Sequence, residues 1–317
     1  RWAHGQVNPF GMTIDHRGDI FTADCHTKPI TMLLRGGQYP MFGKPHDGLG
    51  FAPGIMEHGH ESTGIAGVAF YDADMFPAAY RHNLFIGNPV TGRINRDTLE
   101  HHGSSPRAIA QPDFLTCDDP WFRPVDIRLG PDGALYVADF YNRIIGHYEV
   151  PLTHPQRDRE RGRIWRIRYV GEGEAKPTPA PDLAKADVDG LIAALAHPNI
   201  VVRNLATHEL AHRIGADAVE PLRTLVVGDV KSKEATDAPA NQKVHGLWVL
   251  HRLGALSQDA RLKLLFDPSP LVQLHAVKAI ADQSEVPQLQ LALLWSKLKD
   301  ADPFVRRAIA DALTVHV

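Results

Sequence analysis

Hydrophobic and polar positions along this chain follow two different periods. From residue 1 to about residue 169, apolar residues alternate with polar ones in short segments separated by Gly, Pro and Asp, which is the pattern of β-strands joined by turns. From about residue 187 onward the period is that of amphipathic helices. Between these regions Pro177, Pro179 and Pro181 exclude a helix or a central strand. We therefore predict a β-domain over 1–169, a Pro-rich linker over 170–186 and an α-domain over 187–317.

The β-domain contains an internal repeat. Residues 9–24 align without a gap with residues 124–139, and a looser copy occupies 67–87, so that a unit recurs at intervals of about 57 residues. Each copy is predicted to form a strand, a turn and a second strand. Units of short strands that recur in this way are typical of β-propeller blades. Because so few units cannot close a ring, we predict a partial propeller of about three blades.

The α-domain is predicted to contain four helix pairs. The expected helices are residues 188–197 with 199–214, 217–228 with 239–254, 257–266 with 269–282, and 285–298 with 302–315. Three of the second helices share a start, in which a Pro lies a few residues before a valine: Val202, Val272 and Val305. Stacked pairs of this kind bury their apolar faces against neighbouring pairs. We therefore predict a HEAT-like α-solenoid, whose surface would hold a protein partner.

Composition and charge exclude several classes of partner. The 317 residues are 44% hydrophobic and 22% charged, with a formal net charge of −3, so nothing favours binding to nucleic acid. No segment approaches the ~18 apolar residues that a transmembrane helix requires, so we predict no transmembrane segment. The sequence opens within a strand-like pattern and without a signal peptide. We therefore expect it to be a fragment of a longer protein.

Several stretches of the β-domain carry recognisable motifs. They include His4-Gly5-Gln6-Val7-Asn8-Pro9, Asn83-Leu84-Phe85-Ile86-Gly87 and Gly130-Pro131-Asp132-Gly133-Ala134-Leu135-Tyr136-Val137. These motifs resemble the glucose/sorbosone dehydrogenase family, whose members are six-bladed propellers that hold pyrroloquinoline quinone. Residues 137–167 together with the helical region are similar to large exported planctomycete-type membrane-bound dehydrogenases, which are PVC-type haem-binding proteins. Those proteins join such a propeller to HEAT repeats and to a c-type cytochrome domain.

The resemblance implies a reaction and a set of cofactors. The complete protein would oxidise a sugar or polyol with pyrroloquinoline quinone and calcium and would pass electrons to haem c, although this sequence lacks the Cys-x-x-Cys-His haem motif. Among the family's quinone-binding positions, Asn8 and Arg123 match, whereas Val125 replaces a second arginine. The calcium segment corresponds to residues 25–29, which carry few oxygen ligands. The family's catalytic base lies outside this sequence. We therefore expect a periplasmic or exported parent and an inactive fragment.

A candidate metal site comes from the residues themselves. The segment Glu57-His58-Gly59-His60-Glu61 is the densest group of potential ligands, and alternate histidines can face one ion. We predict that His58 and His60 bind a metal ion together with Asp24. The alternative is a charged loop at the mouth of the propeller. Asp24 and Asp139 also end equivalent strands, so turn caps that accept backbone N–H groups explain both of them as well.

Two further side chains have no counterpart in the repeat. Asp126 stands where the first copy has Gly11, so the repeat does not require this carboxylate, and we select it as a catalytic candidate. His147 lies in a polar loop and is a candidate proton carrier near neutral pH.

Three functions are compatible with these patterns. The first is a fragment of a quinoprotein-type dehydrogenase that acts on a sugar or polyol. The second is a non-catalytic propeller and HEAT module that binds glycan or protein partners. The third is a metal-dependent, lactonase-like propeller, which requires the loop with His58 and His60 and a carboxylate around one ion.

Overall fold

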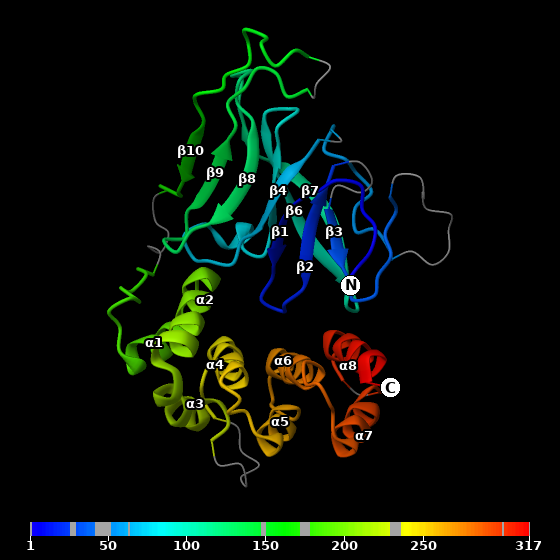
Figure 1. The fold of residues 1–317 in the computed structure, drawn as a ribbon, viewed down its shortest axis with the longest axis vertical. Helices are drawn as coiled ribbons and strands as arrows, with labels where there is room; N and C mark the ends of the chain where they lie inside the picture. Colours follow the sequence, from blue (N-terminus) through cyan, green and yellow to red (C-terminus); the bar gives the residue numbers. More distant parts are fainter. Residues whose placement is uncertain are drawn as a thin grey trace. The chain divides into compact units, whose positions relative to one another are not determined.

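The computed structural model divides the chain into two compact units, Arg1–Pro177 and Thr178–Val317 (Figure 1). The structure describes residues 2–25, 30–41, 52–62, 64–146, 150–171, 178–228, 236–299 and 301–316. The first unit is built from strands and the second from helices. No helix among these residues has the length and apolar character needed to cross a lipid bilayer.

The strand unit consists of three antiparallel sheets, each with its strands in chain order. The first sheet contains β1 (Pro9–Ile14), β2 (Ile20–Asp24) and β3 (Ile30–Leu33). The second contains β4 (Ala66–Phe70), β5 (Leu84–Asn88), β6 (Arg93–His102) and β7 (Ser105–Thr116), with a short helix η1 (Ala78–Tyr80) between β4 and β5. The third contains β8 (Pro124–Leu129), β9 (Leu135–Asp139) and β10 (Arg163–Ile167).

The sequence repeat corresponds to the first hairpin of each sheet. The hairpins β1–β2, β4–β5 and β8–β9 occupy the three aligned segments. Each first strand also has a register shift within one position of the same point, between Phe10 and Met12, between Ala66 and Val68, and between Pro124 and Asp126. A β-bulge bends its strand and increases the local twist, so the three hairpins share a deformation as well as a pattern.

The first strands of the sheets lie very close to one another. A Cβ atom at Gly11 would lie 2.7 Å from the Cα of Gly67, and a Cβ at Gly67 would lie 2.6 Å from the Cα of Asp126. Both glycines have positive φ angles. Only glycine permits this approach together with this backbone conformation. Strand β4 is therefore held between β1 and β8.

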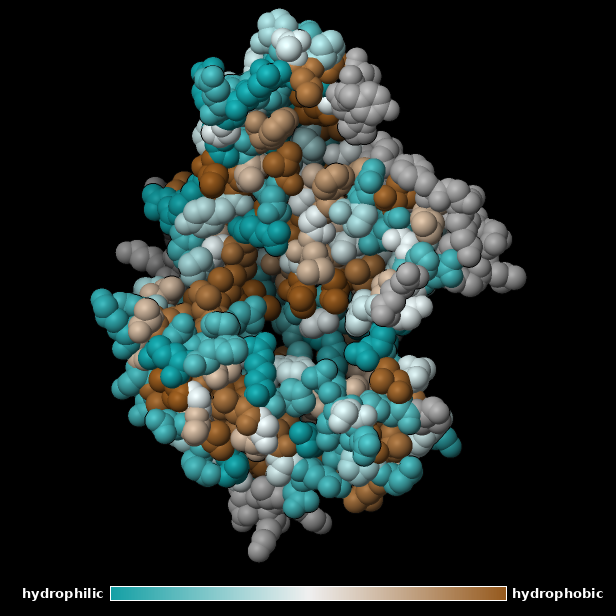
Figure 2. All heavy atoms as spheres, viewed as in Figure 1, coloured by the Kyte–Doolittle hydropathy of each residue, from teal (hydrophilic) through white to brown (hydrophobic). Residues whose placement is uncertain are grey.

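Two apolar clusters lie on opposite faces of the middle sheet. Phe21, Ile30, Val68 and Ile86 belong to the cluster shared with the first sheet. Residues of the second and third sheets form the other cluster, which includes Phe85, Ile127 and Val137. Apolar side chains also reach the surface of the strand unit (Figure 2), among them Phe10, Met12 and Ile14 on β1 and Ile164 on β10. The outer sheets thus each leave apolar side chains uncovered.

The helical unit contains eight α-helices in its described part. They are α1 (Val188–Ala194), α2 (Ile200–Glu209), α3 (Val219–Val226), α4 (Ala240–Arg252), α5 (Gln258–Leu264), α6 (Pro270–Ala281), α7 (Gln288–Lys297) and α8 (Pro303–His316). All eight fall within or close to the predicted segments. The second predicted helix is interrupted: a π-helical turn (Leu210–Ile214) and a 3-10 turn (Gly215–Ala218) follow α2.

The helices pack in sequence order. Each pair, α1 with α2, α3 with α4, α5 with α6 and α7 with α8, is in contact, and α2, α4, α6 and α8 also contact one another in succession. Val202, Val272 and Val305 are all fully buried in the single core of this unit. The apolar faces are thus covered by neighbouring pairs, as the periodicity predicts.

A polar contact recurs at the start of three second helices. The side chains of Arg203, Gln273 and Arg306 donate hydrogen bonds to the backbone carbonyls of His197, Asp267 and Ala301, respectively. Each carbonyl lies just before the helix that carries the donor. Because buried carbonyl groups need partners, this contact stabilises the turn between the two helices of a pair.

Candidate metal centre

The loop with His58 and His60 is fixed at its first residues by apolar packing. Ile55 and Met56 are 5% and 2% exposed and belong to the core between the first two sheets. The Sδ atom of Met56 also accepts a hydrogen bond from the backbone N–H of Ile30 at 3.0 Å. His58 and His60 follow within a few residues, so the packing of Ile55 and Met56 fixes the position of the start of the loop.

The backbone conformation at His60 is unusual. His60 and Glu61 have φ angles of 49° and 59°, in the left-handed region that non-glycine residues rarely adopt. The backbone carbonyl of His60 accepts a hydrogen bond from Nδ2 of Asn88 at 3.0 Å. Strained backbone persists where surrounding contacts hold it, and here it directs the imidazole of His60 toward the sheet.

Asp97 lies opposite this loop, on strand β6. It pairs in register with Leu84 of β5, and directly paired residues share a face of the sheet. Leu84 belongs to the apolar core between the first two sheets, so the carboxylate of Asp97 lies where the polar positions of β6 border that core. The Asp97 side chain is 0% exposed. A buried carboxylate is costly unless cations or hydrogen-bond donors surround it.

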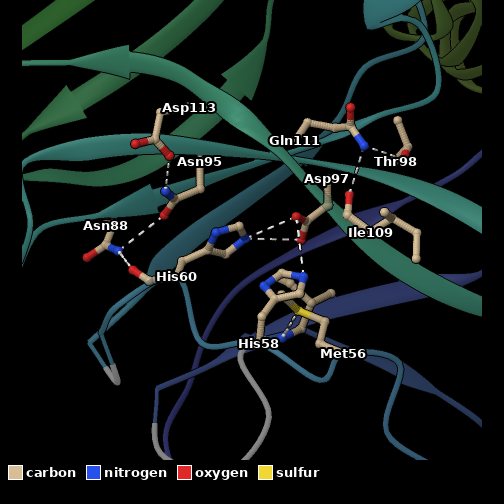
Figure 3. Close-up of polar contacts among 11 residues, drawn as sticks. Met56, His58, His60, Asn88, Asn95, Asp97, Thr98, Ile109, Gln111 and Asp113 are labelled. Carbon is tan, nitrogen blue, oxygen red and sulfur yellow. Dashed lines mark hydrogen bonds and ion pairs between the residues drawn. The ribbon is translucent and has the colours of Figure 1, made fainter.

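Two imidazoles approach this carboxylate (Figure 3). The Nε2 atoms of His60 and His58 lie 3.0 Å and 3.7 Å from Oδ1 of Asp97, and the two rings meet edge to face at 4.4 Å between centroids. One ligand atom from each residue lies within 4.8 Å of the others. The ligand atoms of a tetrahedral zinc ion lie about 3.3 Å from one another. A small shift of these side chains would therefore place all three around one ion.

The electrostatics favour a neutral His58. Burial lowers the pKa of His58, the neighbouring Asp97 raises it, and His60 lowers it further, with a net decrease. A contact with the Ala108 backbone also raises the pKa of His58, but neither ring nitrogen meets the geometry of a hydrogen bond, and Oδ1 of Asp97 also lacks one. A neutral imidazole is the form that binds metal. The group therefore has donor atoms available for an ion.

A network of amides and charges supports the loop. Asn88 donates to Oδ1 of Asn95 at 3.1 Å, and Asn95 donates to Asp113 at 2.6 Å. Arg93 then bridges Asp113 and Glu61, at 3.1 Å and 3.2 Å. Figure 3 shows the part of this network that runs from the His60 carbonyl through Asn88 and Asn95 to Asp113. Partners of this kind orient the ligands of metal sites.

Asp24, which we predicted as a ligand, lies elsewhere. Its carboxylate accepts hydrogen bonds from the backbone N–H groups of Val7 and Asn8, at 2.9 Å and 3.3 Å. The carboxylate of Asp139 does the same for Arg123 and Tyr141. Both aspartates thus make the contacts of turn caps. The structure brings His58 and His60 together with Asp97, and not with Asp24.

Arg123 and Asp126 have different partners from those expected. The guanidinium of Arg123 donates to the backbone carbonyls of Pro89, Asn142 and Arg143, at 2.9, 3.0 and 3.2 Å. Burial and the nearby Arg143 lower the pKa of Arg123. Asp126 pairs with Arg128 at 2.9 Å. Arg123 therefore links the start of β8 to the backbone at Pro89 and at Asn142 and Arg143. His147 lies outside the described residues.

A cavity of about 920 Å³ lies on the other side of the histidine loop. Gly59, Glu61 and Ser62 line it, while the alternate residues His58 and His60 face Asp97. The remaining lining is mostly apolar and includes Phe10, Val90, Val125, Phe140 and Ile145. Among the described lining residues there is no Lys or Arg, and Glu61 is an anion. The described lining of this cavity therefore supplies no pair of cations for the carboxylates of pyrroloquinoline quinone.

Asp97 was not predicted as a functional residue. A signal was present in the sequence, because Arg93, Asn95 and Asp97 place three polar side chains at every second position of a strand. Such alternation indicates one polar face. It does not indicate that the loop with His58 and His60 covers this face.

Comparisons with known proteins find a family model and several solved structures that are similar to part of this chain. A family model described as a domain of unknown function (DUF7133) matches residues 2–171. A solved glucose dehydrogenase is 29% identical, with 44% of this chain and 39% of that chain covered and a TM-score of 0.35. A second glucose dehydrogenase structure gives 28% identity, coverage of 44% and 43%, and a TM-score of 0.34.

A third structure is an oxidoreductase of Thermus thermophilus described as a glucose dehydrogenase, with 22% identity, coverage of 45% and 41%, and a TM-score of 0.31. The chain thus spans about two fifths of the length of these enzymes. No curated protein matches it. Since the family model covers more than half of the sequence, the chain belongs to the DUF7133 family.

Proposed function

We propose that the strand unit binds one divalent transition-metal ion through His58, His60 and Asp97 and uses it to hydrolyse a small ester or lactone. One observation carries this proposal. The fully buried carboxylate of Asp97 has two imidazole Nε2 atoms within 3.7 Å of its Oδ1. A fully buried carboxylate requires positive charge or hydrogen-bond donors nearby, and a metal ion between these three donors would supply positive charge.

The ligand set favours particular metals. Two imidazoles and one carboxylate suit Zn²⁺ or Fe²⁺, whereas Mg²⁺ and Ca²⁺ prefer oxygen ligands alone. The described residues provide three ligands. Three protein ligands leave a coordination position for water or substrate, as in catalytic zinc sites. Such an open position is what a catalytic role at Asp97 requires.

The residues of the chain would prepare the site for this reaction. An ion in such a site supplies an acidified water and polarises a carbonyl group. The side chain of His58 is 27% exposed and that of His60 only 6%, so the approach from solvent is on the side of His58. Asn88 and Asn95 hold the His60 backbone, which limits the movement of the ligands.

The dehydrogenase function implied by the resemblance remains a prediction for a longer protein. Oxidation of a sugar or polyol requires an acceptor, and the described lining of the cavity beside Gly59 and Glu61 offers a quinone no cation. The c-type cytochrome, the export of the parent and a protein partner of the helical unit are likewise predictions that the described residues do not test. Hydrolysis requires only the three ligands, an ion and water.

The test combines metal analysis with a substrate panel. The full chain is stripped of metal and titrated with Zn²⁺ by calorimetry, as wild type, Asp97→Asn, His58→Gln and the control His154→Gln, whose ring lies in an exposed turn. We expect Asp97→Asn and His58→Gln each to lose one bound ion that the wild type and His154→Gln retain. The loaded protein is then assayed on lactones and aryl esters, and on sugars with an artificial electron acceptor.

The outcomes separate the three functions. Chelator-sensitive hydrolysis that Asp97→Asn abolishes supports the proposal. Metal binding without hydrolysis would favour a non-catalytic module in which the ion fixes the loop. Sugar oxidation that does not depend on Asp97 would overturn the proposal in favour of the dehydrogenase.

A further inference from the structure

A second group of metal-ligating side chains joins the first two sheets. His16 lies in the turn between β1 and β2, and Asp72 and His82 lie in the connection between β4 and β5. One ligand atom from each lies within 4.8 Å of the others. Nε2 of His82 is 3.3 Å from Oδ1 of Asp72, and the rings of His16 and His82 are 4.9 Å apart. We infer that these residues form a second, structural metal site that links the β1–β2 turn to the β4–β5 connection.

The turn holds His16 in a fixed position. Oδ1 of Asp15 accepts hydrogen bonds from the backbone N–H groups of Arg17 and Asp19, at 2.9 Å and 2.8 Å, and Gly18 donates to the Asp15 carbonyl. An aspartate that bonds to its own turn in this way makes the turn rigid. In the matching hairpin of the third sheet, Pro131 stands at the position of His16. The turn itself therefore does not require an imidazole.

The backbone at His82 is also strained, as it is at His60. His82 has a φ angle of 59°, and its N–H donates to the carbonyl of Tyr71 at 2.7 Å. The ring lies flat against Phe70, with 5.6 Å between centroids and 5° between planes. A non-glycine residue in this conformation costs free energy, so it persists only where surrounding contacts stabilise it. Here they fix the imidazole of His82 beside Asp72.

The position of this group in the fold gives the ion a role. The connection between β4 and β5 lies between two hairpin turns. Toward the third sheet, the hydroxyl of Tyr71 donates to the carbonyl of Gly133 at 2.9 Å. Toward the first sheet, the corresponding place is occupied by the two histidines and Asp72. An ion bound there would tie the connection to the first sheet as the Tyr71 hydroxyl ties it to the third.

The chemistry indicates which ions would bind. Imidazole and carboxylate ligands suit Zn²⁺, Ni²⁺ and Cu²⁺ better than Mg²⁺ or Ca²⁺. The His82 side chain is 57% exposed, so an ion can enter from solvent and water can complete its coordination. This exposure distinguishes the group from the buried centre at Asp97.

The experiment counts the ions that the full chain binds. Metal-free protein is titrated with Zn²⁺, and with Co²⁺ for its absorption spectrum, as wild type, His82→Asn, His16→Pro, Asp97→Asn and the control His102→Asn. Asn tolerates the backbone conformation of His82, and Pro is the residue of the matching turn. His102 is an exposed histidine outside both groups. Circular dichroism verifies the fold of each variant, and His16→Pro provides the test if His82→Asn does not fold.

We expect two ions for wild type and His102→Asn, and one for His82→Asn, His16→Pro and Asp97→Asn. Affinity at the second site should fall at least tenfold in His82→Asn and His16→Pro. Two ions in both of these variants would overturn the inference, and so would a single wild-type ion that Asp97→Asn abolishes. A single ion that depends on His82 and not on Asp97 would support this site and contradict the metal centre of the proposed function.

Discussion

The Nζ atom of Lys243 lies 3.1 Å from Oδ2 of Asp267, and the two side chains are only 6% and 5% exposed. This ion pair links α4 to the turn that precedes α6. Removal of one partner from a buried pair leaves an uncompensated charge, which costs about 3–5 kcal/mol. We expect Lys243→Ala to lower the free energy of unfolding of the helical unit by this amount, measured by denaturant titration with circular dichroism. The double variant Lys243→Met/Asp267→Leu should lose clearly less, and an equal loss would show that the charge is not the cause.

Trp248 contributes less to stability than a fully buried tryptophan. Its ring is half-buried, and Nε1 donates to Nδ1 of His275 at 3.0 Å. Full burial would predict a loss of about 3–5 kcal/mol for Trp248→Ala. We expect about 2 kcal/mol because part of the ring already contacts water. Trp248→Phe should isolate the hydrogen bond at about 1 kcal/mol. A loss above about 4 kcal/mol for the alanine variant would contradict the exposure of the ring.

Arg123 is expected to act on stability and not on metal binding. Its guanidinium joins the carbonyls of Pro89, Asn142 and Arg143. Hydrogen bonds from a charged donor are worth about 1.5–3 kcal/mol, so Arg123→Ala should destabilise the strand unit by about 3 kcal/mol. Calorimetric Zn²⁺ affinity should stay within a factor of about two, since no ligand contacts this side chain. Arg159→Ala, at an exposed position of the strand unit, is the matched control and should change neither quantity.

Metal removal should destabilise the strand unit through Asp97. A ligand present at about 100 times its Kd stabilises the folded state by about 2.7 kcal/mol. We expect a chelator to lower the melting temperature of the wild type and of His102→Asn. In the Asp97→Asn variant, the chelator should still cause the part of the decrease in melting temperature that arises at the second site of His16, Asp72 and His82. The part that arises at Asp97 should be absent. An unchanged chelator effect in Asp97→Asn would show that no ion is held there.

The support of the His60 backbone can be tested in the same way. Asn88 is fully buried and donates to the carbonyl of His60. Loss of partners that orient metal ligands typically costs about 10–100-fold in affinity. Asn88→Ala should therefore weaken Zn²⁺ binding about tenfold, measured by competition with a chromophoric chelator. Asn95→Ala, one contact further from the loop, should have a smaller effect, and equal affinities in both variants and the wild type would contradict the role of the network.

Local signals explain what the sequence predicts well. The helices follow from short-range periodicity and from starts such as Asp302, whose carboxylate accepts the N–H of Phe304. The hairpins follow from alternation and turn residues, because both act within a few positions. The repeated donors Arg203, Gln273 and Arg306 also reach carbonyls near them in sequence.

The candidate site depends on contacts that periodicity does not encode. Asp97 is far from His60 in sequence, and their proximity requires the packing of a loop on a sheet face. Asp24 ends a strand of the sequence repeat and is therefore easier to select from the sequence. Its carboxylate, however, accepts hydrogen bonds from the backbone N–H groups of Val7 and Asn8. The carboxylate of Asp24, at a repeat position, thus caps its own turn, whereas that of Asp97, outside the repeat, faces the two histidines.

Gly11, Gly67 and Asp126 lie at the close contacts between successive sheets, and they make the two sides of the strand unit different. Each glycine lets the backbone of the following sheet approach to a distance that no side chain permits. At the third position a carboxylate stands instead, so a strand placed beyond β8 could not come as near as β4 comes to β1. The first strands of the three sheets therefore cannot be exchanged for one another without changing how closely the sheets pack. An engineered array of these hairpins would stack tightly only where glycine precedes the joint, and it would end wherever a side chain such as Asp126 fills that place.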